Sequence, residues 1–407
     1  MRRSRLIVGL DVGTTKICAI AGEVKDSRVD VIGVGSHPSK GLRKGMVVNI
    51  EATVDSIKAA VKEAELMAGI EIKAVYVGIA GGHIKGFHSH GVIAVKEREI
   101  TESDIERVID AAKAVAIPLD REILHVIPMG YILDGQDGIR NPIGMTGVRL
   151  ETNVHVVTGA VTSVQNLIKC CHMAGLEVID IVLEPLASGE ATLTQDEKDL
   201  GVGIIDIGGG TTDIALFHDG SICHTAVLGI GGNHFTNDIA VGLRTPLPDA
   251  EKIKKRYGCT MLTMINDGEE IDVHGIGGRP SKTLPRKYLV EIIQPRAEEL
   301  FTLISTDIKH AVCSELIASG IVLTGGATLM EGMREMAEDT LELPTRIGMP
   351  TNIGGLTDIV SSPIFSTGVG LVLYGARFEG IGRGFQEDNL FTGILGKMKE
   401  WVSGIFK

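Results

Sequence analysis

The sequence predicts an α/β protein made of two related halves, because one strand–turn–strand pattern occurs twice, about half a chain apart. The first copy is Asp11-Val12-Gly13-Thr14-Thr15-Lys16, and the second is Asp206-Ile207-Gly208-Gly209-Gly210-Thr211-Thr212-Asp213. An apolar run precedes each copy, another follows it, and a polar turn with a further apolar run comes next. This order is typical of a strand, a tight turn and two more strands.

The first half continues as alternating helices and strands around a segment of different texture. Thr53 and Gly69 are typical of the start and the end of a helix over 53–68. Between 84 and 160 the pattern changes, and a capping box at Thr101 starts a helix to about residue 116. We interpret 84–160 as an inserted α+β subdomain. The other expected elements are strands at 74–80, 91–95, 123–133, 153–159 and 178–183, and helices over 162–174 and from residue 184.

The second half follows the second turn with helices over 234–243 and 250–257. A Gly/Pro-rich loop is expected over 275–285, and a long helix over 288–313 is expected to be interrupted at Pro295. The remaining expected elements are strands at 269–273 and 320–324 and a small-residue helix over 366–378.

Composition excludes several classes of protein. The chain has 407 residues, enough for more than one compact unit, and 44% of them are hydrophobic. Its formal net charge of -12 argues against a protein that coats nucleic acid. No apolar run is long enough to span a bilayer. The six cysteines show no framework spacing, and we expect reduced, buried thiols. The group His83, His88 and His90 is expected to form a surface loop.

The paired turns are suited to a metal-bound polyphosphate. Asp11 and Asp206 each end a strand, where a carboxylate can hold a hydrated Mg²⁺ and orient water near the terminal phosphate, which makes Asp206 a catalytic candidate as well. The residues that offer backbone amides, hydroxyls or a cation to phosphates are Gly13, Thr14, Thr15, Lys16, Gly208, Gly209, Gly210, Thr211 and Thr212. Either segment alone is equally typical of a hairpin without ligand. Because the two occur as a pair, they predict one nucleotide held from both sides.

Two other features are candidates for the nucleoside end. The turn Gly325-Gly326-Ala327 allows close backbone approach to a flat group, although a strand-to-helix turn needs the same glycines. Glu251, Lys254 and Lys255 share one helix face and could reach a ribose or a purine, although a solvated charged face explains them equally well. Gly231 and Gly232 introduce the helix that follows the second hairpin and complete the candidate set.

The combination of both turns, Glu184-Pro185 and Thr324–Ala327 resembles the superfamily of actin, heat-shock chaperone and sugar-kinase ATPases. Within it the chain resembles the FtsA family of bacterial cell-division proteins, through segments such as Gly41–Gly45, His125–Pro128 and Asn141–Gly144. The resemblance implies an actin-like duplicated fold, ATP and Mg²⁺ as ligands, and Glu184 near the attacking water. ATP binding is expected with weak or no hydrolysis.

The resemblance also implies a division into subdomains. One core subdomain comprises 1–83 and 161–196 and also receives about 355–380, and the insertion occupies 84–160. The other core comprises 197–229 and 303–354, and 230–302 forms a smaller subdomain. A flexible linker over 381–389 is followed by a terminal helix over 390–407.

That terminal helix is amphipathic. At 100° per residue its apolar side chains fall within an arc of about 160°. They are Leu390, Phe391, Ile394, Leu395, Met398, Trp401, Val402, Ile405 and Phe406. Lys397 and Lys399 lie on the other face. A helix docked on the protein's own core is the alternative, but the large side chains and the lysines favour a helix at the surface of an anionic membrane.

The FtsA resemblance implies an adaptor on the cytoplasmic face of the membrane at the division septum. Such a protein polymerises head to tail and tethers FtsZ filaments. The basic candidates for binding the FtsZ carboxyl-terminal tail are Arg279, Lys282, Arg286, Lys287 and Arg296, although a solvated basic surface explains any one of them equally well. Other division proteins are expected at the insertion. A pilus-assembly adaptor and a sugar-type kinase remain the alternatives.

Overall fold

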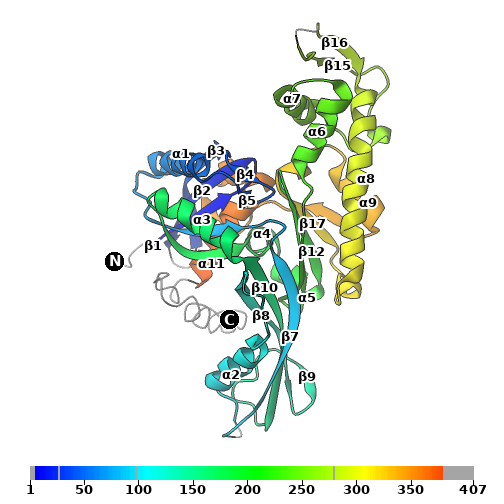
Figure 1. Ribbon diagram of the computed structural model, residues 1–407. Helices are drawn as coiled ribbons and strands as arrows, with labels where there is room; N and C mark the ends of the chain where they lie inside the picture. The colour runs from blue at the N-terminus through cyan, green and yellow to red at the C-terminus, as the bar shows by residue number, and fades with distance from the viewer. Residues whose placement is uncertain (1–4, 26–27, 98, 278–279, 379–407) are drawn as a thin grey trace.

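The computed structural model describes residues 5–25, 28–97, 99–277 and 280–378, which form two halves and an inserted subdomain (Figure 1). The expected linker at 381–389 and the expected terminal helix at 390–407 lie outside the described residues. Among the helices within these ranges, none has the length and apolar content needed to cross a bilayer.

The first half is built on a six-stranded sheet with the order β11-β6-β1-β2-β3-β19. Strands β1, β2 and β3 form an antiparallel meander, and β6 and β11 extend it in parallel. The strands are β1 (Arg5–Val12), β2 (Lys16–Lys25), β3 (Arg28–Pro38), β6 (Ala74–Ile79), β11 (Glu177–Leu183) and β19 (Gly354–Gly355), and a small hairpin is formed by β4 (Leu42–Arg43) and β5 (Met46–Val47).

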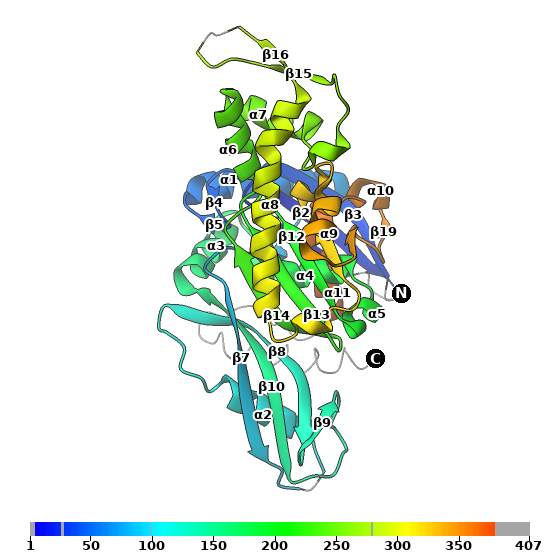
Figure 2. The same ribbon diagram turned by 90° about the vertical axis from the view of Figure 1, so that its right-hand side faces the viewer.

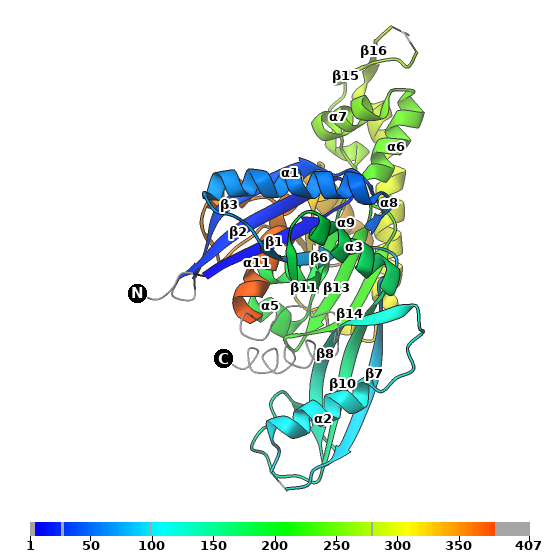
Figure 3. The same cartoon turned by 60° about the vertical axis from the view of Figure 1, so that its left-hand side comes forward.

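Helices cover this sheet (Figure 3). The helices of this half are α1 (Ile50–Ala68), α3 (Val161–Met173), α4 (Glu184–Thr192), α10 (Thr357–Val360) and α11 (Ser366–Phe378), with a 3₁₀ turn η4 (Pro363–Phe365) before α11. Helix α1 begins one turn earlier than the sequence predicts, because the Asn49 side chain, not Thr53, accepts the capping hydrogen bond from the Ala52 amide at 3.1 Å.

The second half repeats the first. Its five-stranded sheet has the order β14-β13-β12-β17-β18, again an antiparallel meander extended by two parallel strands. The strands are β12 (Val202–Ile207), β13 (Thr212–His218), β14 (Ser221–Leu228), β17 (Ile321–Thr324) and β18 (Thr345–Ile347). Since β12 takes the place of β1 and β17 that of β6, the predicted duplication is confirmed.

The long helix α8 runs along the second half (Figure 2). The helices of this half are α5 (Gln195–Leu200), α6 (Gly232–Leu243), α7 (Leu247–Tyr257), α8 (Arg286–His310) and α9 (Met333–Leu341), with 3₁₀ turns η1 (Leu262–Met264), η2 (Ser314–Leu316) and η3 (Gly326–Leu329). The predicted interruption at Pro295 is wrong: α8 continues through it, and the fully buried Ile293 and Ala297 on either side hold the helix in the core. The prediction of a loop over 275–285 is wrong for its last four residues. They form strand β16 (Lys282–Pro285), which pairs with β15 (Glu270–Val273).

The insertion is a four-stranded sheet with the order β7-β10-β8-β9 and one helix. Its elements are β7 (Lys85–Ala94), β8 (Arg121–Leu133), β9 (Gln136–Ile139), β10 (Arg149–Ala160) and α2 (Glu102–Lys113). Helix α2 begins at the predicted capping box of Thr101 and Asp104. Apolar side chains of α2 and the sheet form a core of their own.

The insertion packs on the edge strand β14 of the second half. His88 Nε2 lies 2.8 Å from the Cys223 carbonyl oxygen, and His155 Nε2 lies 2.8 Å from the Thr225 hydroxyl. The expectation of a histidine surface loop is therefore wrong, because His88 and His90 lie on β7 and His88 contacts β14. The predicted strand at 91–95 covers only the end of β7, because periodicity in the glycine-rich segment before it was too weak a signal.

A disulfide between Cys223 and Cys313 contradicts the expectation of reduced thiols. Cys223 lies on β14 and Cys313 follows α8, 90 residues further along the chain. The spacing of the cysteines carries no signal for this pair, because it is the packing of α8 beside β14 that brings them together. Cys18, Cys170, Cys171 and Cys259 are buried free thiols.

Alkylation should count the free thiols. In denaturant without reductant, we expect iodoacetamide to modify four of the six cysteines, and all six after reduction, as intact mass would show. Reduction is also expected to lower the free energy of unfolding by about 4 kcal/mol, because the bond closes a loop of 90 residues in the unfolded chain. Six modified cysteines without reductant would contradict the bond.

Candidate functional site

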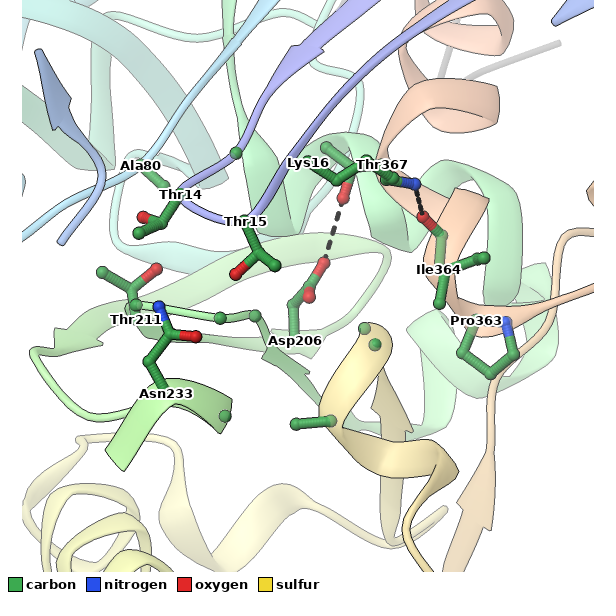
Figure 4. Close-up of a pocket in the computed structure, with 18 of the residues that line it drawn as sticks. Thr14, Thr15, Lys16, Ala80, Asp206, Thr211, Asn233, Pro363, Ile364 and Thr367 are labelled. Atoms are coloured by element: carbon green, nitrogen blue, oxygen red, sulfur yellow. Dashed lines mark hydrogen bonds between the residues drawn. The ribbon is translucent and has the colours of Figure 1, made fainter. Parts of the chain in front are cut away.

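A cavity of about 530 Å³ lies between the two halves, and both glycine-threonine turns line it. Figure 4 shows Thr14 and Thr15 of the first turn facing Thr211 and Asp206 of the second half. This volume is typical of a site for a small molecule or a cofactor. The duplicated hairpins thus meet across one cavity because they occupy the same place in two sheets that face each other.

Asp11 and Asp206 lie at corresponding places near the ends of β1 and β12, and both line the cavity. Burial raises the pKa of Asp11 to about 6, against the lowering effect of the Lys16 charge and with a further rise from Asp206. Burial also raises the pKa of Asp206 above its usual value. Two hydrogen bonds and the Lys16 charge lower this pKa, but their effect is smaller than that of burial. Buried carboxylates of this kind favour a cation as their neighbour.

The two hydrogen bonds come from residues that the sequence analysis missed. Ser188 Oγ donates to Asp206 Oδ2 at 2.6 Å, and Thr367 Oγ1 lies 3.1 Å from the same oxygen. Ser188 lies on α4 and Thr367 on α11, so the first half supplies both donors to a carboxylate of the second half. A serine or threonine in a small-residue helix gives no signal for this role in the sequence.

Two more carboxylates lie close to this pair. Burial raises the pKa of Glu184, at the start of α4, well above its usual value, and the charges of Asp11, Asp213 and Asp206 add to the rise. Burial and Asp206 likewise raise the pKa of Asp213 on β13 to about 8. One side-chain oxygen of Asp213 is buried without a hydrogen-bond partner. Glu184 lines the cavity.

Asp213→Asn should change how the stability of the nucleotide-free protein depends on pH. A folded pKa of about 8, above the ordinary value of 3.8, means that folding binds a proton, so the stability present at low pH is lost as pH rises toward 8. We expect the variant to be more stable than wild type at pH 8, by on the order of 1–3 kcal/mol, and to show a smaller difference at pH 5. Urea unfolding measures this, with the exposed Asp339→Asn as control; an equal difference at both pH values would contradict it.

The turns offer the donors that a polyphosphate needs. Gly208, Gly209, Gly210 and Thr211 line one wall of the cavity, and Gly13, Thr14 and Thr15 line the other. The walls are close: a Cβ on Gly209 would lie 1.8 Å from Thr15 Oγ1. Only glycine leaves the two turns this near to each other.

Lys16 lines the cavity, but its ammonium group has partners within the chain. Its Nζ donates to the Ile364 carbonyl oxygen at 2.5 Å and lies 4.4 Å from the centre of the Phe365 ring. It therefore joins the first turn to the segment that leads into α11 (Figure 4).

Glu251 and Lys254 form a polar cluster with Thr236 at the other end of the cavity. Burial would raise the pKa of Glu251, but Lys254, 2.7 Å from Oε2, lowers it below the usual value. Lys254 Nζ also donates to the Gly232 carbonyl oxygen at 2.9 Å and contacts the Thr236 hydroxyl at 2.8 Å. Lys255 lies 3.5 Å from Glu251 Oε1. The cluster fastens α7 to the first turn of α6.

An apolar wall lies beside this cluster. Gly325 adopts a φ of 89° at the end of β17, which turns the backbone of Gly326 and Ala327 toward the cavity. Other apolar residues that line the cavity, which the sequence analysis did not single out, are Phe235, Leu329, Met330, Pro363 and Ile364, and the polar Asn233 lies beside Thr211 (Figure 4). A planar base would find apolar surface here and charged groups at its edge.

Thr212 and Gly231 are the two candidates for the nucleotide site that do not line the cavity. The Thr212 hydroxyl donates to the Ile230 carbonyl oxygen at 2.8 Å, which turns it away from the phosphate side. Gly231 caps α6, and a Cβ there would lie 2.7 Å from the Gly208 carbonyl oxygen. Thr212 and Gly231 therefore support the wall of the cavity formed by 208–211 without lining it themselves.

The basic candidates for partner binding lie in different surroundings. Arg286 pairs with Glu269 at 2.6 Å and with Glu331 at 2.5 Å, so it joins the residue before β15 to the segment that leads into α9. Arg296 pairs with Asp238 and Glu299. Lys282 and Lys287 are exposed, and Arg279 lies outside the described residues.

The donor set fits a hydrated cation. Among the described residues, no three His, Cys, Asp or Glu side chains converge closely enough to hold a bare metal ion. Asp206 is nevertheless near enough to Asp11 to raise the pKa of Asp11. Mg²⁺ usually keeps several waters and takes one or two carboxylates plus substrate phosphates, and this pair suits that arrangement.

Solved structures with the same architecture come from actin-like proteins. The "PilM-PilN type IV pilus biogenesis complex" contains a chain that matches 91% of this one with a TM-score of 0.68 at 18% identity, over 98% of its own length. MreB 5 of Spiroplasma citri bound to AMPPNP matches 89% of this chain with a TM-score of 0.55 at 16% identity, over 94% of its own length. The chain thus has the actin-like fold, as the sequence predicts.

Sequence comparison gives the family. The model "Cell division protein FtsA" matches residues 203–370, and "SHS2 domain inserted in FTSA" matches residues 81–158. Cell division protein FtsA of Pseudomonas aeruginosa is 50% identical over all of this chain and 99% of the relative, and that of Bacillus subtilis is 40% identical over 95% and 88%. The chain belongs to the FtsA family of cell-division proteins.

Proposed function

We propose that this cell-division protein binds ATP with Mg²⁺ between its two halves and polymerises on the cytoplasmic face of the membrane at the division septum. There it tethers FtsZ filaments. The observation that carries the proposal is the cavity lined by both hairpin turns, with Asp11 and Asp206 on opposite halves. The FtsA family membership supports the cell-division role and replaces the pilus-assembly and kinase alternatives.

Each part of the cavity has a task in this proposal. Amides and hydroxyls of the two turns bind the phosphates, and Asp11 and Asp206 hold the hydrated cation, which neutralises phosphate charge when bound. The apolar wall and the Glu251–Lys254 cluster hold the nucleoside. Burial and the charges of Asp11, Asp213 and Asp206 raise the pKa of Glu184, and a raised pKa lowers the fraction of carboxylate that could activate water, so we expect weak hydrolysis.

The membrane and FtsZ contacts rest on sequence and family. The nine apolar side chains of 390–407 anchor the protein in anionic lipid, with Lys397 and Lys399 at the headgroups. The subdomain of 230–302 receives the acidic and apolar FtsZ tail. The exposed Lys282 and Lys287 are its proposed basic contacts, while the ion pairs of Arg286 and Arg296 hold the subdomain together. Other division proteins bind the insertion.

Calorimetric titration tests the nucleotide site. Wild type should bind ATP in the presence of Mg²⁺, and Asp11→Asn should weaken binding by more than about tenfold, because it removes a charge-assisted contact. Asp110→Asn, on α2 of the insertion, is the matched control. Absence of ATP binding by wild type would refute the proposal.

Co-sedimentation with an FtsZ tail peptide, ATP and anionic vesicles tests whether the protein tethers FtsZ to the membrane. If the peptide stays in the supernatant, the tethering role is refuted.

A further inference from the structure

Two hydroxyl groups converge on one oxygen of Asp206 in the interior of the protein. Ser188, Thr367 and Asp206 are all buried, with exposed fractions of 0%, 7% and 6%. Ser188 Oγ and Thr367 Oγ1 lie 2.6 Å and 3.1 Å from Asp206 Oδ2, and 3.0 Å from each other. Figure 4 shows Thr367 directed at Asp206.

The protons of this cluster can be assigned from its geometry. Ser188 has one hydroxyl proton, and the short distance to Asp206 Oδ2 assigns it to that bond. The Thr367 proton is then shared between Asp206 Oδ2 and Ser188 Oγ. Both donors therefore serve the same carboxylate oxygen.

The other oxygen of Asp206, Oδ1, lies beside the Gly325 turn. A Cβ on Gly325 would lie 2.4 Å from Asp206 Oδ1, and Gly325 lines the cavity. The carboxylate thus has one oxygen bonded to the first half and one beside the turn that faces the proposed nucleotide. Rotation of the carboxylate group would break both hydroxyl contacts.

The donors come from two helices that are packed backbone to backbone. A Cβ on Gly370 of α11 would lie 1.8 Å from the Ala187 carbonyl oxygen of α4. Ser188 lies four residues after Glu184, so α4 presents both side chains on one face. Asp206 belongs to β12 of the second half. The hydrogen bonds therefore cross from one half to the other at the floor of the cavity.

We propose that Ser188 and Thr367 are positioning residues, whose hydroxyls fix the orientation of the Asp206 carboxylate that would hold a hydrated cation, and which fasten the second half to α4 and α11. This inference rests on the proposed function, since it concerns the Mg²⁺-dependent part of nucleotide binding. Thr367 lines the cavity, but the hydroxyls of Ser188 and Thr367 are both directed at Asp206. Their effect passes through Asp206 alone.

The test compares nucleotide affinity with Mg²⁺ and with EDTA, using a fluorescent ATP analogue and the full chain. Ser188→Ala and the nearly isosteric Thr367→Val should each weaken binding with Mg²⁺ on the order of tenfold, because a hydrogen bond to a charged group is lost. In EDTA the affinity for the analogue should change less than about twofold. The reason is that the Asp206 carboxylate contributes to nucleotide binding only by holding the cation. Thr367→Ser keeps the hydroxyl and should therefore retain the Mg²⁺-dependent affinity of wild type, which Thr367→Val loses.

Thr192→Val is the matched control, because Thr192 is buried on α4 and its hydroxyl donates to the Ser188 carbonyl oxygen at 2.8 Å, not to Asp206. Equal weakening with Mg²⁺ and EDTA, or the same loss in Thr367→Ser as in Thr367→Val, would show a packing role and overturn the inference. Unchanged affinity in the variants would overturn it too. If wild type itself fails to bind the analogue, the proposed function falls, and this inference with it. Thermal unfolding of each variant verifies that it is folded.

Discussion

Without residues 390–407, the protein is expected to lose sedimentation with anionic vesicles by at least about tenfold. Nine apolar side chains, each partly buried at about 1 kcal/mol, give a gross binding energy of about 10 kcal/mol. Forming an isolated helix of this length takes back several kcal/mol, so a single tail binds weakly to moderately. Many tails on one polymer then bind by avidity. The loss should therefore be largest under conditions that favour polymers.

Two controls separate the contributions to this binding. Replacing Lys397 and Lys399 by glutamine should weaken sedimentation with anionic vesicles but leave the weak binding to neutral vesicles unchanged, since each lysine contributes up to about 1 kcal/mol only on anionic lipid. Trp401→Glu should act like the deletion, because it places a charge on the apolar face. Equal sedimentation with and without residues 390–407 would refute the membrane anchor.

The duplicated architecture could be predicted because each half repeats the same local signals. A carboxylate, glycines and threonines between two apolar runs specify a strand, a turn and a strand, and the repeat shows that there are two. The start of helix α2 in the insertion could also be predicted, because the capping box at Thr101 is a local pattern. Turns and helix starts of this kind depend on residues only a few positions apart, so the order of residue types along the chain is enough to predict them.

Contacts between distant segments were not predictable from such patterns. Ser188 and Thr367 are 179 residues apart, and only the packing of α4 on α11 brings both to Asp206. The Cys223–Cys313 disulfide and the contact of His88 with β14 depend in the same way on tertiary structure. At Pro295 the local rule was overridden, because burial of the neighbouring apolar residues outweighs one lost hydrogen bond.

Gly370→Ala is expected to destabilise the protein by about 3 kcal/mol, because the added methyl group would overlap backbone. Its Cβ would lie 1.8 Å from the Ala187 carbonyl oxygen and 2.3 Å from the Ala187 carbonyl carbon. Neither atom can rotate away, so α11 would have to separate from α4. Alanine is intrinsically the better helix former by about 1 kcal/mol, which offsets only part of this loss. Urea unfolding measures the difference in the free energy of unfolding.

Gly368→Ala is the matched control within the same helix. Its Cβ would meet the end of the Ile20 side chain at 2.9 Å, which can move by a small rotation, so a loss of less than about 1 kcal/mol is expected. If Gly370→Ala is as stable as Gly368→Ala, the two helices are not in backbone contact. If it is destabilised as expected, the separation also moves Ser188 away from Thr367. The Mg²⁺-dependent nucleotide affinity should then fall together with stability, since both depend on the same helix pair.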